Sequence, residues 1–358
     1  MTPQESQYYS RQILLDNFGI QNQEKLNSAS ILVIGAGGLG CPVLQSLAGM
    51  GIGNIGIVDY DKVSLSNLHR QTIYKHENIG EWKCEMALQY LKSLNPFITI
   101  DTFRAIADQE TLPALVENFD IVVDCTDNPI SKYLINDVCV KFNKPLVYGS
   151  VFKMEGNVSV FNLNEDSPTL RCLFPENNIE MPDCNRTGIL GIITATTGLY
   201  MATEVVKIIV ENDNVLSGKL LIIKPLENST EVFSFKTSQN GRAESLKNFQ
   251  NSNSSLVISP KALQHLMESE AAFDLIDVRT EEEHDLVNIG GKLIPIDELE
   301  DRVNEIDHIK KTVVYCHHGI RSQNAADFLR KSGFSNILNM EGGIHAWSME
   351  IDENVRIY

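Results

Sequence analysis

The sequence is poor in basic residues for its length. Its 358 residues include 30 Lys and Arg against 47 Asp and Glu, which gives a formal net charge of −17. Proteins that bind nucleic acid through counterion release carry clustered positive charge, and anionic membrane surfaces attract the same charge. The composition therefore argues against nucleic acid and against a membrane as partners.

The sequence also lacks two marks of secreted proteins. The first fifteen residues contain no basic segment followed by an apolar stretch, so we expect no secretory signal. The seven cysteines are odd in number and irregularly spaced, which does not fit a disulfide framework. Both observations favour a reducing compartment, and we expect the protein to be cytoplasmic.

No charged residue occurs between Leu26 and Val58, and a stretch of this length raises the question of a membrane span. Eight glycines between Gly35 and Gly56 interrupt it, however, and glycines at this density mark turns. The stretch therefore predicts a strand, a tight turn, a helix and a second strand.

Short apolar runs alternate with helical patterns over residues 1–240. The runs ILVIG, NIGIVD, ITIDTF, DIVVDC and PLVYGS predict strands. NVSVFN, KLLIIKP and EVFSFK predict further strands, and Gly191 to Ile209 an apolar helix. This alternation predicts an α/β domain with a Rossmann-like, doubly wound parallel sheet that is covered on both faces.

The composition changes after residue 240. Residues 241–255 include eight Ser, Asn or Gln in fifteen positions, which predicts a flexible linker. Residues 256–358 begin a new alternation, with FDLIDVR, KLIPI and TVVYC as strands and RSQNAADFLRKSGF as a helix. This length and pattern predict one small α/β domain.

A glycine-rich motif lies between the first predicted strand and helix. It reads GAGGLG and contains Gly35, Gly37, Gly38 and Gly40. Glycines in this context let backbone N–H groups approach a phosphate at a helix N-terminus. Asp59 ends the next strand, where a carboxylate accepts hydrogen bonds from ribose hydroxyls. These features alone leave an NAD-dependent dehydrogenase and an ATP-binding enzyme equally open.

The segments after Asp59 favour ATP. They add a carboxylate, an amide, a guanidinium and an ammonium, which belong to Asp61, Asn67, Arg70 and Lys83. A triphosphate needs several cationic donors together with Mg²⁺ to hold its charge and to release pyrophosphate. The run DCTDN, from Asp124 to Asn128, then places carboxylates at the carboxyl edge of the sheet, where ligands of such folds bind.

A cysteine motif ends a strand of the second domain. In VVYCHHGIRS, Cys316 comes just before a predicted helix, so loop N–H groups and the helix N-terminus should lower its pKa and stabilise a thiolate or persulfide. The spacing from Cys316 to Arg321 is C-x₄-R, one residue shorter than in phosphatases with a related loop, and it suits a sulfur-sized ligand. His317 and His318 receive no role, since both fit a solvent-facing position equally well.

The motifs of the first domain resemble the ThiF/MoeB/HesA family over about Ser6 to Lys236. They are GAGGLG, D-x-D-x-V-x-x-x-N-L-x-R-Q, IGxxK and DCTDN. The resemblance implies an enzyme that binds Mg-ATP and adenylates the C-terminal Gly-Gly of a ubiquitin-fold sulfur carrier. It also implies residue roles: Gly37 in the phosphate loop, Asp59 on the ribose, Asn67, Arg70 and Lys83 on the phosphates, and Asp127 on Mg²⁺. It further implies a homodimer in which Arg11 enters the partner's ATP site.

The second domain resembles rhodaneses over about Val257 to Trp347. The motifs are Asp277-Val-Arg279, the Cys316 loop and GGIHAW. This resemblance implies that Cys316 carries sulfur and that Arg321 belongs to its loop. Asn288 departs from the histidine that many rhodaneses have there, a peripheral position.

Two cysteine positions of the first domain can be compared with those of the family that it resembles. Many relatives hold zinc with two C-x-x-C pairs, but here the first pair reads Thr169-Leu-Arg-Cys172 and no second pair follows near residues 225–245. One thiolate cannot close a tetrahedral site, so we predict no zinc. Cys184 matches a loop cysteine that in relatives attacks the acyl adenylate or forms a disulfide with a sulfur donor, and Arg186 would favour its thiolate.

The fusion of the two domains narrows the function. A persulfide on Cys316 is a nucleophile suited to displace AMP from an acyl adenylate. The resemblance then implies a carrier thiocarboxylate for molybdopterin, thiamine or thiolated-tRNA synthesis, with sulfur from thiosulfate or a cysteine desulfurase persulfide. Besides the dehydrogenase, two alternatives to this reaction stay open. One is a persulfide carrier or sensor with a degenerate nucleotide domain, and the other is adenylation of a peptide C-terminus with a regulatory rhodanese domain.

Overall fold

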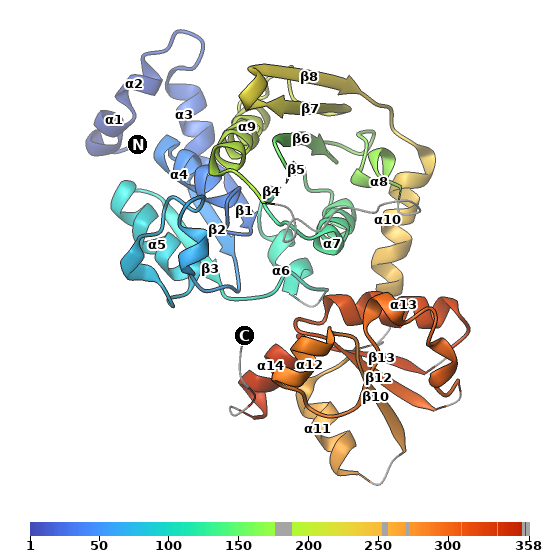
Figure 1. The fold of residues 1–358 in the computed structure, drawn as a ribbon. Helices are drawn as coiled ribbons and strands as arrows, with labels where there is room; N and C mark the ends of the chain where they lie inside the picture. Colours follow the sequence, from blue (N-terminus) through green and yellow to red (C-terminus); the bar gives the residue numbers. More distant parts are fainter. Residues whose placement is uncertain are drawn as a thin grey trace. The chain divides into compact units, whose positions relative to one another are not determined.

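The computed structural model describes residues 1–109, 111–175, 188–252, 257–269, 272–308, 310–334, 336–352 and 355. The chain divides into two compact units, Met1–Asn253 and Ser254–Tyr358, which are described separately (Figure 1).

The first unit is built on an eight-stranded sheet with the order β3-β2-β1-β4-β5-β6-β7-β8. Strands β1 to β5 run parallel, as predicted, and β6 to β8 are antiparallel. The bounds are β1 Ser30–Ile34, β2 Asn54–Val58, β3 Thr99–Phe103, β4 Ile121–Asp124, β5 Leu146–Phe152, β6 Glu155–Phe161, β7 Lys219–Lys224 and β8 Ser229–Ser234.

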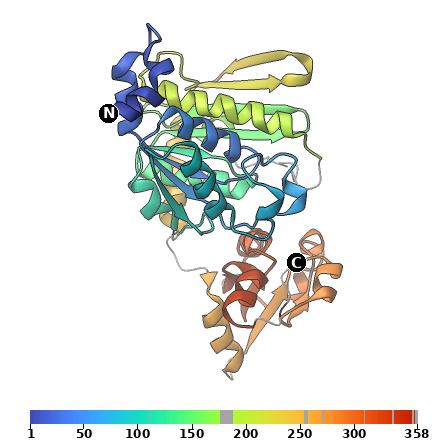
Figure 2. The same ribbon diagram turned by 90° about the vertical axis from the view of Figure 1, so that its left-hand side faces the viewer.

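The three further strands extend the sheet in the antiparallel orientation, which the sequence reading did not assign. Only Lys153 and Met154 separate β5 from β6, and Lys153 has a φ of 54°. A two-residue turn joins antiparallel strands, whereas a parallel pair needs a crossover connection. The short 3₁₀ helix η4 (Pro225–Glu227) and Asn228 likewise connect β7 to β8 as a hairpin (Figure 2).

Helices cover both faces of this sheet and bury two apolar clusters. One face carries α4 (Gly40–Met50), α5 (Lys83–Leu94) and α9 (Gly191–Ile209). The other carries α6 (Thr111–Glu117), α7 (Pro129–Lys141), α8 (Leu170–Leu173) and α10 (Gln239–Ser252) (Figure 1). The remaining elements are α1 (Pro3–Tyr8), α2 (Ser10–Ile13), α3 (Gly19–Ser28), η1 (Leu65–Asn67) and η2 (His76–Asn78).

Helix α9 has the bounds that the sequence predicts. Among the described helices it is the one long and apolar enough to cross a membrane. Its Met201 and Val205 are completely buried in the core and it packs along β5 and β6, so it is a core helix.

The predicted linker over residues 241–255 is wrong for its first part, because residues up to Ser252 belong to α10. Arg242, Ser245 and Phe249, spaced three and four residues apart, face the body of the unit. Arg242 donates to Asn162 at 2.7 Å, Ser245 is buried, and Phe249 packs edge-on against Phe142, the residue that follows α7. The polar composition hid this helical spacing, and residues 253–256 lie outside the described residues.

The second unit has a parallel five-stranded sheet with the order β11-β10-β12-β13-β9. Its strands are β9 Val257–Ile258, β10 Phe273–Asp277, β11 Lys292–Leu293, β12 Lys311–Tyr315 and β13 Ile337–Met340. Its helices are α11 Pro260–Glu268, α12 Glu281–Leu286, α13 Ile320–Lys331 and α14 Gly343–Glu350, with short turns η5 Ile296–Glu298 and η6 Val303–Glu305. The predicted helix and three strands are present, and the sequence reading missed β9 and β13.

Candidate functional site

The glycine-rich loop turns the chain from β1 into α4. Gly35 has a φ of +95°, a conformation that favours glycine. A Cβ at Gly40 would lie 2.0 Å from the carbonyl oxygen of Gly35, so a side chain there would collide with backbone. The tight turn that the sequence predicts is present, and it brings the start of α4 to the carboxyl end of β1.

The other two glycines of the motif lie against polar side chains. A Cβ at Gly38 would come within 3.2 Å of Thr194, and one at Gly37 within 3.5 Å of Gln71 Nε2. Gln71 is 4% exposed, and its Oε1 has no hydrogen-bond partner within the described part of the chain. A buried carbonyl oxygen without a donor is costly, so this oxygen is available to a ligand at the glycine loop. Gln71 ends the motif N-L-x-R-Q, yet the sequence reading gave it no role.

Asp59 anchors the glycine loop at the end of β2. Its Oδ2 accepts a hydrogen bond from the N–H of Ala36 at 2.7 Å, and its Oδ1 accepts one from the N–H of Asp61 at 2.8 Å. Tyr74 holds the same loop by donating to the Ala36 carbonyl at 2.8 Å. Burial raises the pKa of Asp59, and the nearby Lys83 ammonium opposes this rise. Each carboxylate oxygen has a second lone pair, so a ribose hydroxyl can still donate to it.

Lys83 is a buried cation among carboxylates. It begins α5, is 5% exposed, and its Nζ lies 2.7 Å from Asp61 Oδ2. Burial works against its charge, but Asp59 and Asp61 outweigh burial and raise the pKa of Lys83, with a smaller effect from Asp127. The structure therefore brings four of the predicted residues together beside the glycine-rich loop: Asp59, Asp61, Lys83 and Asp127. Of these, Asp127 is exposed and follows β4.

Asn67 and Arg70 lie in the turn after β2. The Asn67 carbonyl Oδ1 accepts from the N–H of Ser64 at 3.3 Å, which closes η1. Arg70 Nη1 donates to the Ser66 carbonyl at 2.9 Å and lies 2.8 Å from Nε2 of His69. Both predicted side chains are thus tied to this turn.

Three predicted residues of the first unit are not among those that the structure places beside the glycine-rich loop. Asp124 is fully buried, 3.1 Å from the Lys132 ammonium, and also accepts hydrogen bonds from Thr126, so it is a strand-end brace. Arg11 lies exposed on α2. Cys184, with its neighbour Arg186, lies outside the described residues.

The surroundings of Cys172 contain mostly hydroxyls. Ser238-Gln-Asn-Gly241 has the same four-residue spacing as Thr169-Leu-Arg-Cys172, and the two segments face each other. Cys172 Sγ accepts from the N–H groups of Thr169 and Ser238, each at 3.4 Å, and a Cβ on Gly241 would lie 2.6 Å from that sulfur. Burial acts against the thiolate, but the hydrogen bonds from Thr169 and Ser238 outweigh it and lower the pKa of Cys172. One thiol, two hydroxyls and a glycine do not form a usual zinc ligand set.

The second unit places Cys316 at the carboxyl end of β12. The thiol is 1% exposed, and the Ser322 hydroxyl donates to its Sγ at 3.4 Å. Gly319, with a φ of +86°, leads into α13, whose first N–H groups have no intrahelical partner. Beside the thiol, burial and the charges of His318 and His345 lower the pKa of His317 to about 4.

Two ion pairs support this loop. Arg321 makes a bidentate pair with Glu283 of α12, with both nitrogen–oxygen distances at 2.6 Å. Arg279 is fully buried, contacts Asp277 at 2.6 Å, and lies over the ring of Tyr315, the residue before Cys316. The sequence motif contained the second pair, but Glu283 as partner of Arg321 was not predicted.

Comparison with known proteins fits both units. One family model, described as the ThiF family, matches residues 9–244, and another, the rhodanese-like domain, matches residues 259–350. The chain belongs to the ThiF family. It is 32% identical to "Adenylyltransferase and sulfurtransferase MOCS3" of Caenorhabditis briggsae, over 98% of this chain and 96% of that one. It is 34% identical to "Probable adenylyltransferase/sulfurtransferase MoeZ" of Mycobacterium tuberculosis, over 98% and 94%.

A solved structure supports the fold of the ThiF family unit. Escherichia coli MccB with ATP superposes with a TM-score of 0.58 at 23% identity, over 65% of this chain and 72% of that one. At this identity the likeness concerns the fold.

Proposed function

We propose that this ThiF family member is an adenylyltransferase and sulfurtransferase that converts the C-terminal Gly-Gly carboxylate of a ubiquitin-fold sulfur carrier into a thiocarboxylate. The relatives named above carry both activities in their names and align over nearly the whole chain. The observation that carries the proposal is the presence of two sites in one chain. One is a glycine loop beside Lys83 and its carboxylates, and the other is a buried thiol at a helix N-terminus.

In the first half-reaction, a carrier carboxylate oxygen attacks the α-phosphorus of ATP and pyrophosphate leaves. Charge accumulates on the leaving group, and preorganised cations beside it lower the barrier. We assign this task to Arg70 and Lys83, with Asn67 as a neutral donor, the loop from Gly35 to Gly40 against the phosphates and Asp59 on the ribose. Lys83 now pairs with Asp61, and a triphosphate offers it more negative charge.

The residues present also fit Mg²⁺, which prefers carboxylate and phosphate oxygens. Asp127 is exposed at the carboxyl edge of the sheet, and its charge acts on Lys83. The unpartnered Oε1 of Gln71 offers a second oxygen beside Gly37. A magnesium ion held by Asp127 would neutralise phosphate charge as pyrophosphate departs.

In the second half-reaction, Cys316 supplies the sulfur. Its thiolate attacks the outer sulfur of thiosulfate and sulfite leaves, so Cys316 becomes a persulfide. The terminal sulfur then attacks the acyl carbon, AMP leaves, and an acyl disulfide forms. A thiolate, which we assign to Cys184, attacks the Cys316 sulfur, releases the thiocarboxylate and leaves a disulfide that an external thiol reduces. A cysteine desulfurase persulfide is the other candidate donor, and the pathway is molybdopterin, thiamine or tRNA thiolation.

We also propose that the enzyme is a cytoplasmic homodimer. Helix α9 and the β7–β8 hairpin lie at one side of the first unit (Figure 2). Their exposed apolar residues are Ile192, Leu199, Tyr200, Val232 and Phe233. Leu14 and Leu15, just after the helix that carries Arg11, are exposed too. Exposed apolar side chains on these elements suit an interface with a second copy, and Arg11 would then lie at an interface, as the family resemblance implies.

The test is to incubate the protein with Mg-ATP, thiosulfate and each small Gly-Gly carrier encoded in the genome, and to measure carrier mass. One carrier should gain the mass difference between sulfur and oxygen, and the same carrier lacking its last glycine should not. ATP–pyrophosphate exchange absent with every carrier would favour the persulfide carrier instead. Exchange with a carrier whose mass stays unchanged in the presence of thiosulfate would favour adenylation alone, with a regulatory rhodanese domain.

A further inference from the structure

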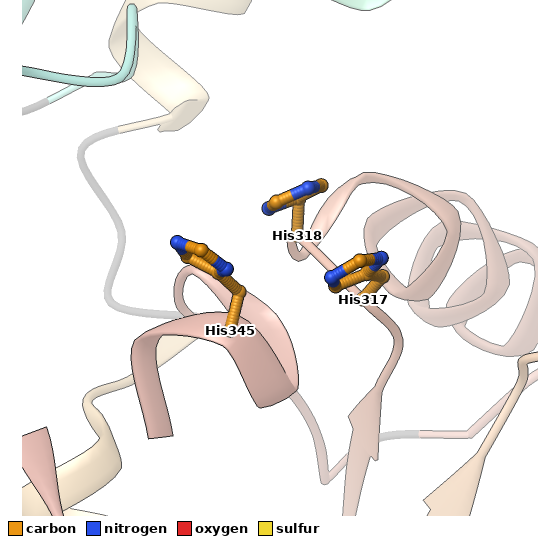
Figure 3. Close-up of side chains that lie close together, drawn as sticks. All are labelled: His317, His318 and His345. Atoms are coloured by element: carbon orange, nitrogen blue, oxygen red, sulfur yellow. The ribbon is translucent and has the colours of Figure 1, made fainter. Parts of the chain in front are cut away.

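Three histidines meet beside the Cys316 loop. His317 and His318 follow Cys316 directly, and His345 lies in the first turn of α14. One ligand atom from each of the three lies within 4.8 Å of the others. Figure 3 shows the rings gathered around one space between the loop and α14, with a ring nitrogen of His317 and one of His345 turned toward each other.

The backbone holds these two segments in register. The N–H of Ile344 donates to the Cys316 carbonyl at 2.8 Å, and the N–H of His345 donates to the His317 carbonyl at 3.0 Å. A Cβ on Gly343 would lie 2.4 Å from both carbonyls, so glycine permits this close approach. This register brings the rings together. The ring centroids of His317 and His318 lie 4.1 Å apart in a stacked pair, and those of His318 and His345 lie 4.9 Å apart. The main chain therefore preforms the cluster.

We propose that His317, His318 and His345 bind one divalent transition-metal ion of the Zn²⁺ class, through three imidazole nitrogens and with one coordination position open. Neutral imidazole is a common ligand of zinc, copper and nickel. Three protein ligands with an open fourth position are typical of exchangeable, chemically active zinc sites. This site goes beyond the proposed adenylation and sulfur transfer, neither of which uses these rings.

The geometry suits this ion with small adjustments. Tetrahedral zinc with nitrogen ligands at about 2.0–2.1 Å needs ligand atoms about 3.3 Å apart. The observed spread is wider and His317 stacks on His318, so the proposal requires these rings to turn about their side-chain torsions, and His318 is exposed. An ion reaches the cluster from solvent for the same reason. Cys316 is not among the ligand atoms of the cluster, and its buried sulfur accepts a hydrogen bond from Ser322.

An anion is the alternative occupant, since three protonated rings would attract a sulfur donor such as thiosulfate. The three ligand atoms lie within 4.8 Å of one another, a close grouping that suits one small cation better than a larger polyatomic anion. The observations therefore favour the metal, and anion binding becomes an outcome of the test.

The test is a Co²⁺ titration of the full-length, untagged, metal-free protein, followed by visible absorption. We expect one Co²⁺ per chain with the d–d bands of tetrahedral coordination, displaced by Zn²⁺. His318→Gln and His345→Gln should each weaken binding by at least the roughly 10- to 100-fold that loss of a ligand-supporting group causes. His265→Gln, which changes an exposed histidine of α11, is the matched control and should bind normally. Cys316→Ser should also bind normally.

A second measurement keeps the proposal falsifiable. Because metal would tie the loop to α14, Zn²⁺ should raise the melting temperature of the wild type and of His265→Gln but not of His318→Gln. Bands that persist in both cluster variants, a sulfur-to-cobalt charge-transfer band that vanishes in Cys316→Ser, or a melting shift with thiosulfate but not with Zn²⁺ would each overturn it. Neither measurement uses ATP or a carrier, so a failure here leaves the proposed function standing.

Discussion

The loops after β1 and β12 share one construction and differ in content. Each follows a parallel strand inside its sheet and leads into a helix N-terminus, that of α4 or of α13. The first loop is made of glycines, so a ligand meets backbone, and its charges come from Lys83 and Asp59 elsewhere. The second begins with Cys316, which supplies the reacting atom itself. The same strand–loop–helix arrangement thus suits ligand binding in the first loop, where glycines leave the backbone open, and a reaction in the second loop, where Cys316 adds a thiol.

The two loops also share a form of support. The strand beside each one ends in a buried aspartate paired with a cation: Asp124 with Lys132 beside β1, and Asp277 with Arg279 beside β12. Both aspartates are fully buried and also accept hydrogen bonds from the residues that follow them. A buried pair of this kind fixes the strand end. The comparison therefore predicts that the stability of each unit depends to a similar degree on its own pair, while the reactions at the two loops can be abolished separately.

The largest expected effect separates the chemistries. Cys316→Ser removes the only sulfur of its loop and should abolish persulfide formation from thiosulfate, because a hydroxyl cannot carry sulfane sulfur. Carrier-dependent ATP–pyrophosphate exchange should persist at the wild-type rate. Mass spectrometry of the thiosulfate-treated protein and an exchange assay measure the two results. Loss of exchange in this variant would show that the units do not act separately.

The shared support is the next point to test. Arg279→Met and Lys132→Met each leave a buried carboxylate without its cation, which should cost about 3–5 kcal/mol of unfolding free energy. Urea unfolding gives the size, and hydrogen exchange should locate the loss at β10 and β12 for the first variant and at β1 and β4 for the second. Arg302→Met, which breaks surface pairs with Glu298 and Glu305, is the control and should change little. A loss of protection spread over both units in either variant would break the comparison.

A smaller effect concerns the cation-binding side of the first loop. Asp127→Ala removes the carboxylate that we assign to Mg²⁺, and loss of such stabilisation should lower pyrophosphate exchange about 10²- to 10³-fold. Thiosulfate:cyanide sulfurtransferase activity should be unaffected. Asp166→Ala, an exposed aspartate of the same unit, is the control. Exchange that stays at the wild-type rate would remove Asp127 from the site.

The sequence predicts what depends on neighbours in the chain. The turn at Gly35 to Gly40 and helix α9 follow from local pattern, since glycine spacing and apolar periodicity act over a few residues. The β5–β6 hairpin needed attention to the length of its connection, and α10 required helical spacing to be recognised beneath a polar composition. Both signals were present in the sequence.

The parts that could not be predicted depend on contacts between distant segments. Glu283 neutralises Arg321 across 38 residues, and Ser238 reaches Cys172 across 66. Neither partner stands at a position that a motif marks. Gln71 is different, because its motif was recognised, but only packing against Gly37 shows that its oxygen is buried without a donor. Motifs therefore located the sites, and tertiary packing decided what each side chain contacts.

The smallest expected effect is a shift in the pKa of Cys172, whose sulfur, like that of Cys316, accepts hydrogen bonds. Cys172 accepts from the Ser238 hydroxyl at 3.6 Å as well as from backbone, and these bonds lower its pKa despite burial. A lowered pKa keeps the thiolate populated to lower pH, so alkylation of Cys172 should persist below the range of an ordinary thiol. Ser238→Ala removes one bond to the charged form, which should raise the pKa and move the alkylation midpoint upward by less than about one pH unit.

Peptide-resolved labelling with iodoacetamide across pH measures this midpoint, and Ser93→Ala, an exposed serine bonded to its own helix, is the control. A midpoint that does not move would mean that backbone N–H groups alone hold the sulfur. The surroundings of Cys172 would then use the device inferred for Cys316, main-chain donors around a single thiol, and the two units would be more alike than their loops suggest.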